Sequence, residues 1–207
     1  NMYYSNFNIT SAYNNNSFTL AWPVGTGTLY SNVVIPDGYY TVETLNNFLQ
    51  NFMIQNGLYL INSAGQYVYY FEIITNPTYY GIQINLYNLP TSLPSGWTAP
   101  SGFVFPSTAR SPFVTIGDSN NFGQLIGFLP GTYNNPTQIS NLVPRMSPVQ
   151  SYILQCPNLR NIMSNPTTNL YTFSPGDTEF GALISSSAYE LVYCDIIDCT
   201  ITYLDIF

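Results

Sequence analysis

The chain has 207 residues and a net charge of −7, and only 6% of its residues are charged, against about 25% in ordinary soluble domains. It contains neither Lys nor His, so its three cations are Arg110, Arg145 and Arg160. This composition excludes the basic patch that nucleic acids or anionic membranes require, and it excludes Ser-His-Asp, Cys-His and Schiff-base catalysis.

Three segments at the start of the chain alternate apolar and polar residues, which is typical of half-buried strands. The second of them places Phe18, Leu20 and Trp22 on one face. The predicted strands cover residues 6–12, 17–22 and 29–35.

One amphipathic helix is predicted near residues 42–55. Its N-cap is expected at Thr41, with Glu43 in the first turn, and Asn56-Gly57 signals its end. An i, i+3, i+4, i+7, i+8 stripe would close an open end or side of the sandwich through Leu45, Phe48, Leu49, Phe52 and Met53. The residues expected to face outward or toward a neighbour are Asn46, Asn47, Gln50 and Asn51.

Further strands are predicted on both sides of a proline-rich stretch. A hairpin is expected at residues 58–61 and 66–74, then a strand at 79–87, and after a short helical segment at 118–128 the chain returns to strands. The late predicted strands cover residues 151–156, 170–173, 188–192 and 195–206.

Residues 89–112 are dense in Pro, Ser and Gly and have little periodicity. A segment of this kind is expected to be an insertion or an extended loop that presents Trp97, Phe103 and Phe105. The whole pattern predicts one all-β domain over residues 1–207, a jelly-roll β-sandwich with one helix.

The chain has three cysteines and neither His nor a CxxC pair. Cys194 and Cys199 would lie on opposite faces of a strand, roughly 16 Å apart, which is too far for a disulfide. We expect these two and Cys156 to be reduced, mostly buried thiols, and we expect no zinc site. The sequons at Asn8 and Asn15 carry little weight in so Asn-rich a chain.

Carboxylates are the remaining candidates for chemistry. The pairs Asp177/Glu179 and Asp195/Asp198 could support glycoside hydrolysis or hold calcium. Acids in turns usually serve turn and capping bonds, so no catalytic residue, metal ligand or cofactor is assigned. The candidate interface or ligand contacts are Trp97, Phe103, Arg110, Arg145 and Arg160.

Five segments, at residues 35–46, 82–84, 125–131, 151–159 and 200–205, resemble in their order along the chain those of penton-type minor capsid proteins of virophages and polinton-like viruses. Residues 35–41, IPDGYYT, followed by Leu45-Asn46, resemble that family's I-P-x-G-x-Y segment before a helix. Similar pieces follow at 82–84 with 125–131, at 151–159 and at 200–205, whereas 89–112 match no motif of the family.

This resemblance implies a single jelly-roll virion protein that forms homopentamers at icosahedral vertices. Its expected partners are itself, trimers of a double jelly-roll major capsid protein and other minor capsid proteins. It implies no enzymatic activity, no nucleic-acid binding and no membrane insertion. It also implies that the protein is located in the virion capsid after assembly in the host cell cytoplasm. The alternatives from the residues are a viral receptor- or glycan-binding module that uses Trp97 and tyrosines, and a carboxylate hydrolase.

Overall fold

The computed structural model describes the chain except residues 1, 148, 177, 186–193 and 197–207. Its contacts form two compact units. We call Phe7–Met146 the sandwich unit, and Asn1–Asn6 with Ser147–Phe207 the terminal unit. The sequence shows no linker at this boundary, and the expectation of one domain over residues 1–207 stays a prediction.

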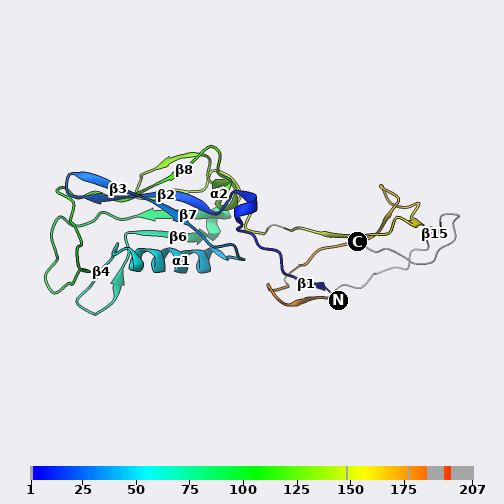
Figure 1. Cartoon of the computed structure of the whole chain (residues 1–207), viewed down its shortest axis with the longest axis horizontal. Helices are drawn as coiled ribbons and strands as arrows, with labels where there is room; N and C mark the ends of the chain where they lie inside the picture. The colour runs from blue at the N-terminus through cyan, green and yellow to red at the C-terminus, as the bar shows by residue number, and fades with distance from the viewer. Residues whose placement is uncertain (1, 148, 177, 186–193, 197–207) are drawn as a thin grey trace. The chain divides into compact units, whose positions relative to one another are not determined.

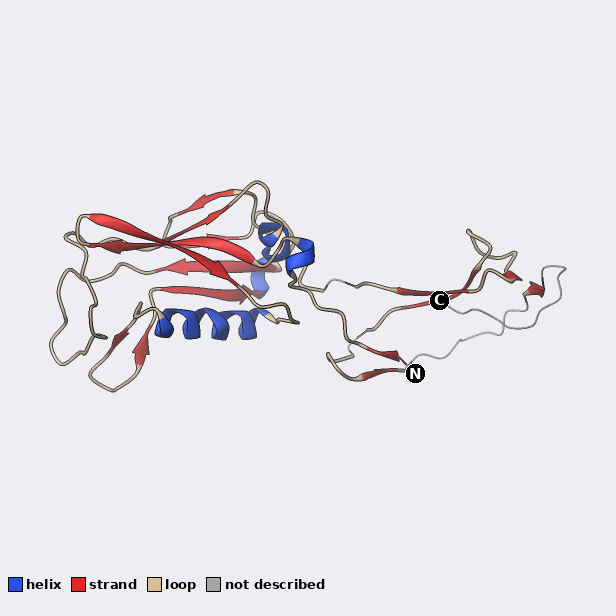
Figure 2. Ribbon diagram, in the orientation of Figure 1, coloured by secondary structure: helices blue, strands red, loops and turns tan. Residues whose placement is uncertain are grey.

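The sandwich unit is an all-β sandwich of antiparallel sheets, as the sequence predicts (Figures 1 and 2). One sheet has the strand order β3-β2-β8-β9 and the other the order β10-β7-β6, while β4 and β5 pair in a separate hairpin. The jelly-roll connectivity stays a prediction. The strands are β2 (Ser17–Val24), β3 (Gly27–Val34), β4 (Leu60–Ile61), β5 (Tyr67–Val68), β6 (Phe71–Asn76), β7 (Gly81–Leu86), β8 (Phe113–Ile116), β9 (Gly131–Tyr133) and β10 (Thr137–Ile139).

The two sheets share one apolar core. Phe18 on β2 stacks on Phe122 at 4.9 Å between ring centroids, and it meets Phe71 on β6 edge-on at 6.1 Å. Trp22 meets the ring of Tyr70 at 6.2 Å. The predicted inward face of β2 is therefore confirmed, and each fully buried side chain of this size contributes about 1.5–3 kcal/mol of transfer free energy.

The helix α1 (Val42–Gln55) begins and ends where the sequence predicts. The hydroxyl of Thr41 accepts a hydrogen bond from the N–H of Thr44, and the Thr44 hydroxyl accepts one from the N–H of Thr41, so two N–H groups are satisfied reciprocally. Leu45, Leu49 and Met53 are buried, and α1 lies alongside β6 (Figure 1).

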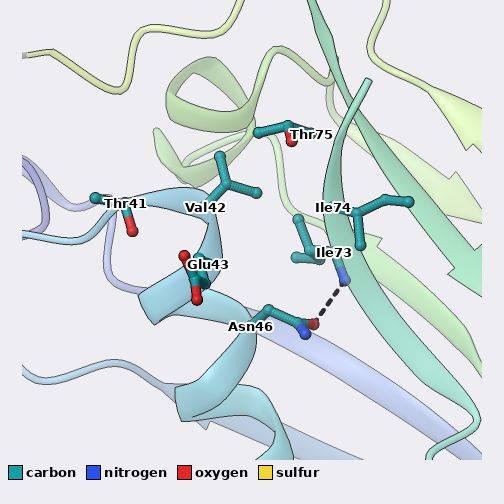
Figure 3. A pocket seen from close by; sticks show the side chains of 7 residues that line it. All are labelled: Thr41, Val42, Glu43, Asn46, Ile73, Ile74 and Thr75. Carbon is teal, nitrogen blue, oxygen red and sulfur yellow. Dashed lines mark hydrogen bonds between the residues drawn. The ribbon is translucent and has the colours of Figure 1, made fainter. Parts of the chain in front are cut away.

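The side chain of Asn46 does not face outward as predicted. Its Oδ1 accepts a hydrogen bond of 3.0 Å from the N–H of Ile73 on β6 (Figure 3). β6 is the last strand of its sheet, and α1 lies along its open edge. The Asn46 amide therefore satisfies a backbone N–H of β6 that would otherwise lack a partner.

Residues 6–12 do not form the predicted strand. They include an isolated bridge between Ile9 and Gly38, and the 3₁₀ helix η1 (Ser11–Tyr13) follows. Ile9 exchanges two backbone hydrogen bonds with Gly38, and Asp37 accepts one of 2.7 Å from the Ser11 N–H. A single bridge and a side chain thus satisfy this backbone in place of a continuous strand partner. The predicted 66–74 strand is also divided, into β5 and β6.

Two further short helices lie in the sandwich unit. The 3₁₀ helix η2 (Pro77–Tyr79) follows β6, and α2 (Phe122–Ile126) confirms the helical segment predicted at 118–128. Gly127 ends α2 with a φ of 80°. A Cβ there would lie 2.3 Å from the Leu142 carbonyl oxygen, so only glycine fits.

The described residues of the terminal unit form short strand pairs. β11 pairs with β13 where the sequence predicts strands, and β1 pairs with β14 and β12 with β15. Its strands are β1 (Met2–Tyr3), β11 (Tyr152–Gln155), β12 (Leu159–Arg160), β13 (Asn169–Phe173), β14 (Leu183–Ile184) and β15 (Asp195–Ile196). The strand predicted at 188–192 and most of the one at 195–206 lie outside the described residues.

Cys156 is buried and Cys194 half-buried, and both are free thiols, as predicted; Cys199 lies outside the described residues. In the described part of the chain, no helix combines the length and apolar character needed to cross a membrane.

Candidate functional site

The acidic residues offer no metal-binding cluster among the described residues. Asp37 binds the backbone of Ser11, and Glu72 accepts hydrogen bonds from two neighbours. Asp177 and Asp198 lie outside the described residues, so the structure does not test either predicted acid pair.

Both sequon asparagines of the sandwich unit are buried rather than available to a glycan. The Asn8 side chain donates to the carbonyls of Tyr40 and Met146 at 2.7 and 2.8 Å, and it accepts from the Tyr40 N–H at 2.8 Å. Asn15 donates to the Asn8 carbonyl at 2.7 Å and accepts from the Thr10 N–H at 2.9 Å. Both amides therefore hold the fold together.

Residues 89–112 are anchored to the sandwich at several points. Leu89 bridges Arg110, Ile61 bridges Thr98, and Gly25 bridges Pro106. The rings of Trp97, Phe103 and Phe105 are partly buried and pack against the core, and Phe103 and Phe105 also contact each other at 4.8 Å. Only part of each ring is thus left to contact a ligand or partner.

The three arginines lie in different surroundings. Arg110 donates from Nη2 to the carbonyls of Gly27 and Gly25 at 2.9 and 3.2 Å, so it fastens the end of the loop to the β2–β3 turn. The side chains of Arg145 and Arg160 are exposed, the first in a loop of the sandwich unit and the second on β12 of the terminal unit. The structure does not gather these cations into one site in either unit.

Three tyrosines converge on the β4–β5 hairpin. The ring of Tyr67 lies 5.0 Å from that of Tyr59 and 6.2 Å from that of Tyr69, with the second pair nearly parallel. Burial, then the nearby hydroxyls of Tyr67 and Tyr59, raises the pKa of Tyr69. Sequence analysis did not reveal this cluster, because it is the hairpin pairing of Ile61 with Tyr67 that brings Tyr59 close.

A polar network crosses β6 and β7 and continues beyond β7. Glu72 accepts hydrogen bonds from the Tyr87 hydroxyl at 2.5 Å and from the Asn85 amide at 2.8 Å, and Gln83 donates to Asn85 at 2.7 Å. The hydrogen bond to Glu72, followed by burial and the Glu72 charge, raises the pKa of Tyr87 to about 12. Nothing in the sequence signals this network, because the β6–β7 register pairs Glu72 with Asn85.

We expect the Glu72→Gln variant to bring the pKa of Tyr87 back toward the ordinary tyrosine value of 10, since it removes both the charge and the strongest acceptor. The folded pKa lies above the ordinary value, so this contribution to stability is complete below pH 10 and is lost as pH rises through about 12. Ultraviolet titration of phenolate absorbance measures the shift. The Tyr87→Phe variant identifies which part of the signal belongs to Tyr87, and an unchanged profile in Glu72→Gln would contradict the assignment.

A groove of about 510 Å³ lies between the first turn of α1 and β6 (Figure 3). Its lining combines apolar side chains with hydroxyls, one amide and one carboxylate. These polar groups suit hydrogen bonding, and the lining contains no cationic side chain. The lining residues are Thr41, Val42, Glu43, Asn46, Ile73, Ile74 and Thr75.

The segments that carry the capsid-protein resemblance serve packing where they are described. In IPDGYYT, Ile35 is buried, the Tyr40 hydroxyl donates to the Pro36 carbonyl at 3.0 Å, and a Cβ on Gly38 would lie 3.0 Å from the Tyr40 ring. These residues form a bend that leads directly into α1. Comparison with models of protein families, with curated proteins and with solved structures found no match.

Proposed function

We propose that this protein is a structural virion protein, a penton capsid protein that forms homopentamers at the vertices of an icosahedral capsid. Trimers of a double jelly-roll protein would surround it there. An all-β sandwich with little charge and neither Lys nor His supports a structural role.

The observation that carries this proposal is the exposed apolar and aromatic surface of the sandwich unit. Tyr80 is 86% exposed, Val143 76% and Tyr30 64%, in a chain whose charged residues number thirteen of 207. A monomer normally stays soluble through charged side chains, so a surface of this kind favours lateral contact with other protein subunits.

We expect purified protein to assemble as its concentration rises. Five copies of 23.2 kDa would give about 116 kDa, which multi-angle light scattering across a range of concentrations measures directly. Moderate salt should change this mass little, because screening acts on charges and this surface has few. A trimer would contradict the pentamer, and a monomer at every concentration would contradict self-assembly.

The glycan-binding alternative is favoured by the Tyr59–Tyr67–Tyr69 cluster. An exposed Tyr67 ring beside two hydroxyl-bearing neighbours can stack on a sugar and donate to its oxygens. Binding on a glycan array that Tyr67→Ala abolishes and Tyr80→Ala preserves would support this function.

A further inference from the structure

The edge strand β3 forms one border of the four-stranded sheet. It pairs with β2 over its whole length of eight residues, from Val34 opposite Ser17 to Gly27 opposite Val24, without a register shift. Its sequence, GTLYSNVV, contains no charged residue and no proline. A long, regular, uncharged edge of this kind is a ready template for another strand.

The hydrogen-bond pattern identifies the groups that face away from β2. The Ile35 N–H donates to the Asn16 carbonyl at 2.7 Å, which sets the phase of the antiparallel ladder. Every second residue of β3 from Val33 back to Gly27 then bonds to β2, so the N–H and C=O groups of Thr28, Tyr30 and Asn32 point to the open side. No backbone partner is found for these groups within the described residues.

The other three edges of the two larger sheets, at β6, β9 and β10, are each protected. α1 lies along β6, and Asn46 takes the N–H of Ile73. β9 and β10 have three residues each, and Pro130 and Pro136 precede them closely. Short strands, prolines and a covering helix are the usual ways in which proteins prevent edge pairing, so β3 differs from its counterparts.

The chain itself contains strands that match this edge. Among the described residues of the terminal unit, β11 and β13 form a ribbon of two strands, of four and five residues, and neither strand includes a charged residue. An isolated two-stranded ribbon is marginally stable, so it gains from a third strand. Leu29, Tyr30 and Val34 are about half or more exposed on β3 and add apolar contact to such a pairing.

We propose that the free edge of β3 pairs with a strand of a second copy of this chain, so that a β-sheet continues across the interface between subunits. This inference rests on the proposed self-assembly and names the contact that makes it. Backbone hydrogen bonds would supply the affinity, and the apolar side chains of β3 would supply the register.

The test uses two substitutions at Asn32, whose side chain is exposed and whose N–H points to the open side. Asn32→Pro removes that donor without removing a bond to β2, and Asn32→Lys adds a charge to the edge. Asn47→Lys makes the same chemical change on the exposed face of α1 and serves as the matched control. Light scattering gives the assembly constant of each, and hydrogen exchange reports the outward-facing amides of Thr28, Tyr30 and Asn32.

We expect both Asn32 variants to weaken assembly about 10-fold or more, with Asn47→Lys unchanged. We expect the outward-facing amides of Thr28, Tyr30 and Asn32 to be protected only in the assembled protein. If the protein assembles but neither variant weakens it, this inference is wrong while the proposed self-assembly stands. Protection of these amides in the dilute monomer would also overturn it, because the chain would then cover its own edge. A wild-type protein that never assembles overturns both proposals.

Discussion

The Leu49→Asp variant is expected to lose the cooperative fold of the sandwich unit at neutral pH. Leu49 is 1% exposed and lies in the middle of the buried stripe of α1. Truncating a buried leucine costs about 2–5 kcal/mol, and an unpaired carboxylate at the same place adds a large desolvation penalty. Since domains are stable by only about 5–15 kcal/mol, circular dichroism and urea denaturation should show a largely unfolded chain.

The matched control is Asn51→Asp on the same helix. Asn51 is exposed, so the new carboxylate remains in water and the free energy of unfolding should change by less than about 0.5 kcal/mol. A Leu49→Asp protein with a normal urea midpoint would show that the stripe of α1 does not pack into the core.

The Asn8→Ala variant should lose about 3 kcal/mol or more of stability. Asn8 is 1% exposed, and its amide makes three hydrogen bonds with the main chain of Tyr40 and Met146. Truncation leaves the Tyr40 N–H and two carbonyls without this partner, at about 1–3 kcal/mol for each buried group that stays unsatisfied. Equilibrium urea denaturation, monitored by tryptophan fluorescence, measures the loss.

The Asn47→Ala variant provides the comparison for Asn8, because Asn47 is exposed on α1. It should unfold at nearly the wild-type urea concentration. A loss below about 1 kcal/mol in Asn8→Ala would mean that water replaces the amide at low cost, and Asn8 would then not be a structural clamp.

The sequence by itself determined the elements whose signals are local. The apolar stripe and the Thr41 cap predict α1 and its buried face, and alternation predicts the buried faces of β2 and β7. Side-chain direction in a helix or strand follows directly from residue spacing. The near absence of charge likewise restricts function without any coordinates.

Only the tertiary structure decided what depends on partners distant in sequence. Residues 6–12 alternate like a strand, yet Asn8 and Asp37 hold them in another conformation through bonds to residues up to 138 positions away. The residue pattern places Asn46 on the polar side of its helix, but its side chain accepts a hydrogen bond from the edge strand β6. The tyrosine cluster, the Glu72–Tyr87 bond and the unprotected edge at β3 arise from strand register and sheet order, which no local pattern of residues encodes.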